Sequence, residues 1–265
     1  MTASDTKPIS TTPVLTIAEG KAIVRLNRPA EHNRLEPADL AALVELFDRV
    51  DREPGIRVLV ITGTGKSFSS GFHIGALSER KAGDEPAHDP NAFEKMVDRL
   101  EDLRVPTIAA LNGGVYGGAT DLALACDFRL GVETTRMFMP AARLGIVYYE
   151  SGLRRYVSRL GLNNAKRLFL TAEPVEAETL VEMGYLDEIV PAAELEARVA
   201  ALASQIAANA PLAIAATKKA LNDVARGRLD PAEHASARAL CSGSEDHKEG
   251  LKAWAEKRKP VFKGQ

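Results

Sequence analysis

Residues 105–130 read VPTIAALNGGVYGGATDLALACDFRL, and this stretch decides the fold class. Thr107 to Leu111 is an apolar run of strand length, Gly117 to Ala125 has the composition of a short helix, and Phe128 to Gly131 is apolar again. Alternation of strands and helices is typical of α/β proteins, in which helices cover a mostly parallel sheet. The sequence therefore predicts an α/β fold.

The same pattern extends toward the N-terminus. Val14 to Ile17 and Ala22 to Leu26 have the composition of paired strands, and Pro37 to Val50 carries apolar residues at helical spacing. Arg57 to Thr62 (RVLVIT) then predicts a short buried strand. The expected order is β-β-α-β.

The last third of the chain has a different character. After Ile189 and Val190 the pattern predicts no further strand. We expect a disordered lead over residues 1–13, a core of alternating strands and helices over 14–192 and a C-terminal helical region over 193–265 that covers the core or packs against another subunit. Its predicted helices are Ala193 to Ala208, Leu212 to Ala225, Ala232 to Leu240 and Asp246 to Arg258.

Composition excludes several classes of function. The chain has 265 residues, 45% of them hydrophobic, and a net charge of −2, which disfavours a general nucleic-acid binder. It has neither an apolar run long enough for a membrane helix nor a stretch resembling a signal peptide, so we expect no membrane partner and a cytoplasmic protein. Cys126 and Cys241 lack metal-ligand spacing and are predicted to be buried thiols, and no metal site is expected.

Two glycine-containing segments follow predicted strands. They are FSSGFHI (residues 68–74) and NGGVYGGATD (residues 112–121). In the second, glycines open a helix whose first N–H groups have no intrahelical partner and could hold a developing oxyanion. Alternatively, the glycines only permit tight turns and close packing. Neither segment has the spacing of a P-loop or a dinucleotide fingerprint.

These segments belong to a longer series of motifs. LNRP (26–29) with Asn33, VLVITGTGKSFSSGFHI (58–74), the stretch 105–130, LGI (144–146), LTAEPVEAETLVEMGYLDEIVP (170–191) and the end of the chain from Glu249 to Phe262 follow one another in order. Together they resemble the enoyl-CoA hydratase/isomerase (crotonase) superfamily over residues 14–263. The resemblance implies a spiral of β-β-α turns and a C-terminal region that forms trimers, often paired into hexamers. It also implies a coenzyme A thioester as substrate and no cofactor beyond that coenzyme A.

The resemblance also assigns catalytic roles. It places the two oxyanion donors, which stabilise a thioester enolate, at the backbone N–H groups of Phe72 and Gly118. Hydratases of the family use two glutamates, and the corresponding residues here are Asp121 and Ala141. Ordinary two-glutamate hydration is therefore in doubt.

Residues 148–151 carry larger side chains than the small residues that hydratases of the family have at these positions. Tyr148 matches a tyrosine of methylmalonyl-CoA decarboxylases, and Tyr149 falls where dienoyl-CoA isomerases and chlorobenzoyl-CoA dehalogenase keep an aspartate. Both tyrosines either bind an acyl carboxylate or line the pocket. We expect Asp121 and Glu150 to form the acid–base pair, the alternative being that Glu150 pairs with Arg154 four residues on.

The resemblance further predicts where coenzyme A binds. Arg28 to His32, including Ala30, and Ser70 to Ile74 correspond to loops that wrap adenine and pantetheine. His73 is expected to contact coenzyme A or support another residue, with proton transfer as the alternative. Lys259 and Phe262 resemble a tail that reaches a neighbouring subunit's nucleotide, the alternative being a solvated charged tail. His247 to Gln265 carries six Lys and Arg against two Asp and Glu, which suits a phosphate.

Three functions follow from these observations. The leading one is an acyl-CoA enzyme, nominally a hydratase or isomerase. A decarboxylase or thioester hydrolase is the enzyme alternative, because loss of CO₂ generates the enolate without the missing glutamate. A non-catalytic binding protein on the same fold, such as the RNA-binding members of the superfamily, is the alternative from another class. The polar stretch Gly83 to Asn91 is expected to be a mobile surface loop.

Overall fold

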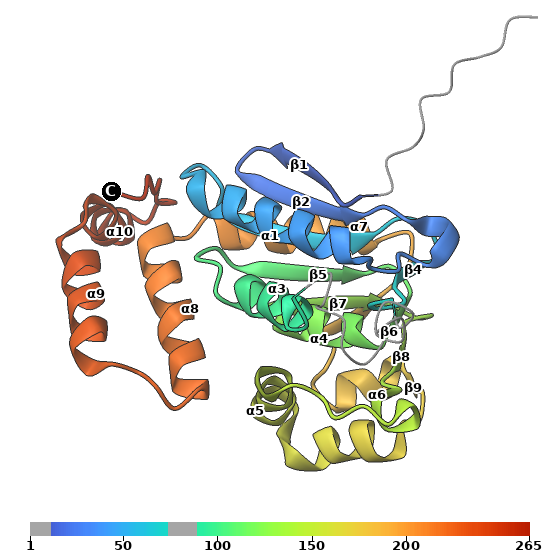
Figure 1. Ribbon diagram of the computed structural model, residues 1–265. Helices are drawn as coiled ribbons and strands as arrows, with labels where there is room; N and C mark the ends of the chain where they lie inside the picture. Colours follow the sequence, from blue (N-terminus) through green and yellow to red (C-terminus); the bar gives the residue numbers. More distant parts are fainter. Residues whose placement is uncertain (1–11, 74–88) are drawn as a thin grey trace, which may run out of the picture.

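Two sheets form the centre of the computed structural model, which describes residues 12–73 and 89–265 (Figure 1). The larger sheet pairs its first two strands antiparallel and all later neighbours parallel. Its order is β1 (Val14–Ala18), β2 (Lys21–Leu26), β3 (Val58–Gly63), β5 (Thr107–Leu111), β7 (Phe128–Val132) and β10 (Glu188–Val190).

The smaller sheet is built from very short strands. Its order is β4 (Ser67–Ser69), β6 (Gly114–Tyr116), β8 (Arg136–Phe138) and β9 (Val175–Glu176), and only the pairing of β8 with β9 is antiparallel. The chain passes from β3 to β4, from β5 to β6 and from β7 to β8, so each turn contributes one strand to each sheet. This arrangement confirms the predicted β-β-α spiral.

Helices cover both faces of the larger sheet. Because successive residues of a strand point to opposite faces, Leu59 and Ile61 pack into the cluster with α1 (Pro37–Arg52) and α3 (Ala92–Glu101). Val58 and Val60 pack instead with α7 (Leu195–Ala207). The further helical elements of the core are η1 (Pro29–Glu31), α4 (Gly118–Ala125), η2 (Ala141–Leu144), α5 (Glu150–Lys166), η3 (Arg167–Thr171) and α6 (Ala177–Glu182).

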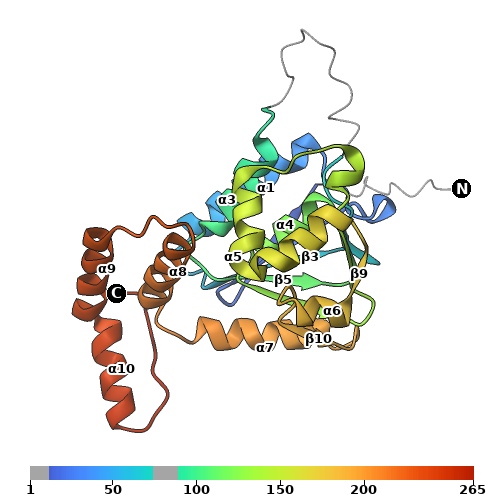
Figure 2. The same cartoon turned by 90° about the horizontal axis from the view of Figure 1, so that it is seen from below.

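The C-terminal helices stand to one side of the sheets (Figures 1 and 2). They are α8 (Pro211–Ala225), α9 (Pro231–Gly243) and α10 (Glu245–Ala255), which confirms the predicted helices. Lys218 of α8 docks this region by donating hydrogen bonds to Val105 O (2.8 Å) and Asp127 Oδ2 (2.7 Å). The predicted boundary at residue 193 assigns α7 to the C-terminal helical region, but in the structure α7 packs against the larger sheet of the core.

The sequence-based expectations differ from the structure in two places. The strands of the smaller sheet were not predicted, because two or three residues are too few to show a hydrophobic period. Helices α3, α5 and α6 were not predicted either. Residues 1–11 of the expected disordered lead lie outside the described residues. Residues 83–88 of the expected mobile loop do so as well. Within the described ranges no single helix is long and apolar enough to cross a membrane, although α7 and α8, bent by 103°, reach that length and composition together.

Candidate active site

The predicted oxyanion donors meet where two neighbouring strands end. Strands β4 and β6 are parallel, so their carboxyl ends lie side by side, and Phe72 and Gly118 follow them within three residues. A Cβ placed on Gly71 would lie 3.0 Å from Gly118 N and 2.6 Å from Tyr116 O. The two segments are therefore in backbone contact, and Gly71, with φ of 88°, is required there.

Both donors lack a hydrogen-bond partner among the residues that the structure describes. Leu35 N donates to Gly71 O (2.9 Å) and His73 N donates to Leu35 O (3.0 Å), so the N–H of Phe72, which lies between them in an extended segment, points away from Leu35. Gly118 is the first residue of α4, where an N–H has no intrahelical acceptor. Within residues 12–73 and 89–265, neither N–H donates a hydrogen bond.

Aromatic rings surround these donors. The ring of Phe93, in the first turn of α3, lies against the Cα of Gly118, because a Cβ there would be 2.6 Å from Phe93 Cζ. Its centroid is 5.9 Å from that of Phe72 and 6.1 Å from that of Tyr149. Tyr149 stacks on Tyr148 with centroids 4.3 Å apart. The rings form one wall that extends from the donors to the start of α5.

A buried charge pair lies behind this wall. Asp121 and Arg155 have no exposed surface. Arg155 Nε donates to Asp121 Oδ1 at 3.0 Å and Nη2 donates to Oδ2 at 2.9 Å, a bidentate pair. The hydroxyl of Tyr149 also donates to Asp121 Oδ2. Burial, followed by the charge of Asp121, raises the pKa of Tyr149 well above 10, so its phenol stays neutral.

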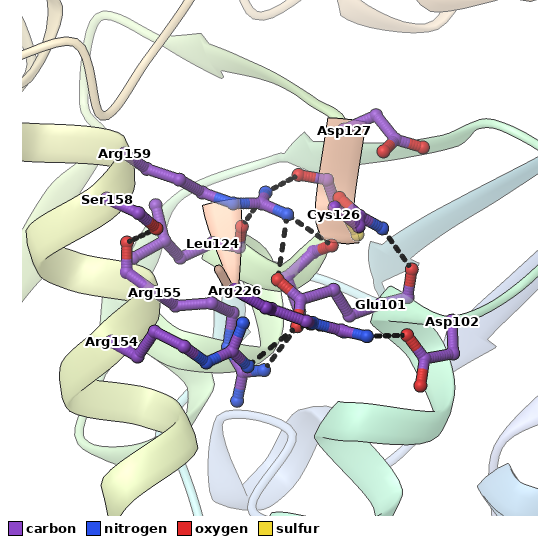
Figure 3. A network of polar contacts seen from close by, with 12 residues as sticks. Glu101, Asp102, Leu124, Cys126, Asp127, Arg154, Arg155, Ser158, Arg159 and Arg226 are labelled. Carbon is purple, nitrogen blue, oxygen red and sulfur yellow. Dashed lines mark hydrogen bonds and ion pairs between the residues drawn. The ribbon is translucent and has the colours of Figure 1, made fainter. Parts of the chain in front are cut away.

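The other side of Arg155 belongs to a larger network around Glu101 (Figure 3). Glu101, at the end of α3 and 3% exposed, forms ion pairs at 2.6 to 3.2 Å with four arginines. Burial alone would raise the pKa of Glu101, but the guanidinium charges outweigh it and lower the pKa to about 2. Helices α3, α5 and α8 are thus joined by one carboxylate. Its partners are Arg154, Arg155, Arg159 and Arg226.

The predicted acid–base residues lie in different surroundings. Asp121 is fully buried and Glu150, the first residue of α5, is exposed. Arg154 pairs with Glu101 at 3.2 Å, and among the described residues it forms no ion pair with Glu150, so the pairing suggested as the alternative for Glu150 is not present. Ala141 is 6% exposed and brings no polar group to the site. The assignment of an acid–base pair stays a prediction.

The two predicted coenzyme A segments are brought together. Ser70 N donates to His32 O at 2.7 Å, and His32 Nδ1 lies 2.9 Å from Ser67 Oγ. Ala30 is exposed, while the guanidinium of Arg28 is held by buried Asp39 at 3.0 Å.

The remaining residues predicted to contact coenzyme A are His73 and Ile74, at the end of the second segment, and Lys259 and Phe262 of the tail. His73 Nδ1 is 2.9 Å from Glu36 Oε2, and Ile74 lies outside the described residues. The tail lies away from this site: Arg57, just before β3, donates to Phe262 O at 3.0 Å, and Lys259 is exposed. The tail thus contacts the residue that precedes the amino end of β3, whereas the oxyanion donors follow the carboxyl ends of β4 and β6.

Several residues of the site were not predicted. Phe93 and Glu94 lie in the first turn of α3, and Glu94 Oε1 accepts a hydrogen bond from Ser151 Oγ at 2.9 Å. Arg155 follows Arg154 in the sequence, and the two residues differ only in the face of α5 on which they lie. Arg155 is on the face that packs into the core. Amphipathic spacing along α5 was the one signal that could have found it. Among the described residues, no three His, Cys, Asp or Glu side chains are placed to hold a metal ion.

Comparison with known proteins identifies the class first by fold. A crystal structure of an enoyl-CoA hydratase/carnitine racemase from Magnetospirillum magneticum superposes with a TM-score of 0.89 and 28% identity, covering 96% of each chain. The two-sheet spiral with its helical extension is therefore the crotonase fold.

Sequence comparison then gives the family. The family model described as enoyl-CoA hydratase/isomerase matches residues 16–265. The crotonyl-CoA hydratase of Syntrophomonas wolfei is 33% identical over 94% of this chain and 96% of its own, and the carnitinyl-CoA dehydratase of Salmonella typhimurium is 34% identical over 91% and 94%. The chain belongs to the enoyl-CoA hydratase/isomerase family of enzymes.

Proposed function

We propose that this enzyme binds an acyl-CoA thioester and stabilises its enolate between the N–H groups of Phe72 and Gly118. The observation that carries the proposal is that neither N–H group is paired with a described residue and that both lie in adjoining backbone segments at the carboxyl ends of β4 and β6. Donors fixed by the backbone need no reorganisation when negative charge develops on the thioester oxygen, so they favour the transition state over the substrate.

Reversible hydration of a 2-enoyl-CoA is the leading reaction. Relatives that are 31 to 34% identical are named crotonyl-CoA hydratase, 2,3-dehydroadipyl-CoA hydratase and carnitinyl-CoA dehydratase, which supports addition or loss of water. Glu150 is exposed at the start of α5 beside Tyr149 and is the carboxylate proposed to exchange a proton with water.

Decarboxylation is the second candidate. Asp121 is bound through both oxygens by Arg155, and Ala141 replaces the other carboxylate of the hydratases. A site with few free carboxylates suits a reaction in which departure of CO₂ itself forms the enolate. The same oxyanion donors would serve both reactions.

Substrate binding and assembly complete the proposal. The backbone of residues 28–32 and 70–73 would hold coenzyme A, while Lys259 and Phe262 of a neighbouring subunit would reach its nucleotide. A homotrimer, or a hexamer of two trimers, is supported by large apolar side chains left exposed on α8, α10 and the tail. They are Leu221, Val224, Leu251, Trp254 and Val261. A cytoplasmic location and the absence of any cofactor other than coenzyme A stay predictions.

A proline tests the oxyanion donor directly. Gly118→Pro removes the N–H, whereas Gly118→Ala retains it and adds a similar contact with Phe93, so alanine is the matched steric control. We expect proline to lower turnover about 100- to 1000-fold relative to alanine. Equal rates for the two variants would contradict the role of Gly118.

A substrate panel distinguishes the reactions. Crotonyl-CoA, a 3-enoyl-CoA, methylmalonyl-CoA and an aryl-acyl-CoA are offered to the wild type and to Glu150→Gln. Hydration of crotonyl-CoA that is lost in Glu150→Gln supports the leading reaction, and release of CO₂ from methylmalonyl-CoA supports the second. Binding of RNA at physiological salt without binding of any thioester would refute the enzymatic proposal.

A further inference from the structure

The hydroxyl of Tyr149 stands at the end of a chain of hydrogen bonds with a fixed direction. The chain begins at Arg155, whose guanidinium carries donors only. It continues to Asp121, whose two oxygens accept from Arg155 at 3.0 and 2.9 Å. The proton of Tyr149 is then given to Asp121 Oδ2. A carboxylate held in this way can only accept, so the single hydroxyl proton of Tyr149 is committed to it.

The oxygen of Tyr149 is left as an acceptor. A phenolic oxygen has two acceptor positions, and one receives the hydroxyl of Tyr148 at 3.3 Å. Within residues 12–73 and 89–265, no group donates a hydrogen bond to the other position. The raised pKa of Tyr149, caused by burial and by Asp121, keeps the proton on the phenol and so preserves the direction of the chain.

Tyr149 is also the member of the chain whose ring packs on Phe93, the ring that lies against Gly118. Asp121 lies three residues after Gly118 on α4, so the two are neighbours on one face of that helix. Asp121 and Arg155 are fully buried, whereas Tyr149, Phe93 and Phe72 are half-buried. A thioester whose carbonyl oxygen met Phe72 and Gly118 would therefore extend its acyl group toward Tyr149 along the wall made by Phe93.

We propose that the oxygen of Tyr149 accepts a hydrogen bond from a hydroxyl on the third acyl carbon, or from a water molecule in its place. Asp121 and Arg155 are then positioning residues, because they fix the direction in which Tyr149 bonds. The site selects a group that can donate a hydrogen bond. A carboxylate cannot donate, so this inference favours hydration over decarboxylation. It rests on the proposed binding of an acyl-CoA thioester.

Equilibrium binding tests the inference without relying on turnover. The dissociation constants of 3-hydroxybutyryl-CoA and butyryl-CoA are measured by calorimetry, and absorbance reports any conversion of the hydroxy ligand to crotonyl-CoA. One hydrogen bond should make the hydroxy ligand bind about tenfold more tightly to the wild type. Tyr149→Phe keeps the ring and should bring this ratio close to one. Binding of butyryl-CoA shows that each variant is folded.

Tyr185→Phe is the matched control, because Tyr185 is fully buried and its hydroxyl donates to Thr120 O at 2.8 Å, a bond within the core. It should leave the ratio as in the wild type. A ratio that survives Tyr149→Phe, or that falls equally in Tyr185→Phe, overturns the role of Tyr149 while leaving the oxyanion donors in place. Failure of the wild type to bind either thioester refutes the proposed function itself, and this inference with it.

Discussion

Replacement of Glu101 by glutamine should destabilise the protein strongly. The side chain keeps its shape in Glu101→Gln but loses the charge that four arginines share. Arg155 retains its ion pairs with Asp98 and Asp121, and Arg226 retains its ion pair with Asp102. These remaining ion pairs compensate only in part for the lost charge of Glu101.

The magnitude follows from the pKa of Glu101. A folded-state pKa of about 2, against an ordinary 4.5, corresponds to about 3 kcal/mol of unfolding free energy. No large discount for solvent is needed, since the side chain is only 4% exposed. Breaking a buried ion pair by removing one partner costs about 3 to 5 kcal/mol, which agrees.

The sign of the pH dependence is fixed as well. Because the folded-state pKa is depressed, the stabilisation is fully present above pH 4.5 and is lost as the pH falls toward about 2. The difference in unfolding free energy between the wild type and Glu101→Gln should therefore shrink over that interval.

Urea unfolding at one protomer concentration measures the effect, because assembly also contributes stability. Glu249→Gln is the control: hydrogen bonds from Arg258 and from Val261 N lower the pKa of Glu249 to about 2 as well, but Glu249 lies outside the core. Its replacement should have a much smaller effect, because solvent screens such pairs. Equal midpoints for the two variants would refute the reasoning.

Three further outcomes follow from individual contacts. Gly71→Ala should abolish thioester turnover, since φ of 88° is unfavourable for alanine and its Cβ would lie 3.0 Å from Gly118 N; steady-state kinetics would show it. Gly152→Ala should displace both Tyr148 and Tyr149, whose rings contact that Cβ position, and so reduce the preference for the hydroxy ligand measured by calorimetry. Cys126 should resist thiol reagents in the native protein and react only in urea, because burial and the charge of Asp127 raise its pKa to about 12.

The larger sheet could be predicted because its strands have both faces covered. Strands β3 and β5 are buried at every residue, which produces the continuous apolar runs seen in the sequence. Strands β4, β6 and β8 have three residues each, and their pairing depends on the neighbouring turns of the spiral. No pattern within so few residues could reveal it.

The candidate site divides in the same way. The placement of the Phe72 and Gly118 donors follows from strand ends and glycine turns, which are local features. The surroundings of Asp121 depend on Arg155, 34 residues later, and on Glu101, 20 residues earlier. Which of two consecutive arginines turns inward is set by how α5 packs: the Arg155 side chain has no exposure, against 27% for Arg154. Sequence position could locate the carboxylate but not its partner.

The two ends of α4 explain why this network is charged. Gly118 begins the helix with an N–H that no described residue accepts, and only eight residues later the last carbonyls of the helix need donors. Arg159 supplies them by donating to the carbonyl oxygens of Leu124 and Cys126, which places a guanidinium beside the core. A charge in that position needs a counter-ion, and Glu101 pairs with it at 3.1 Å. Glu101 also binds Arg155, which orients Asp121 near the first turn of α4. One carboxylate therefore connects Arg159, at the C-terminal end of α4, with Arg155, near its N-terminal end.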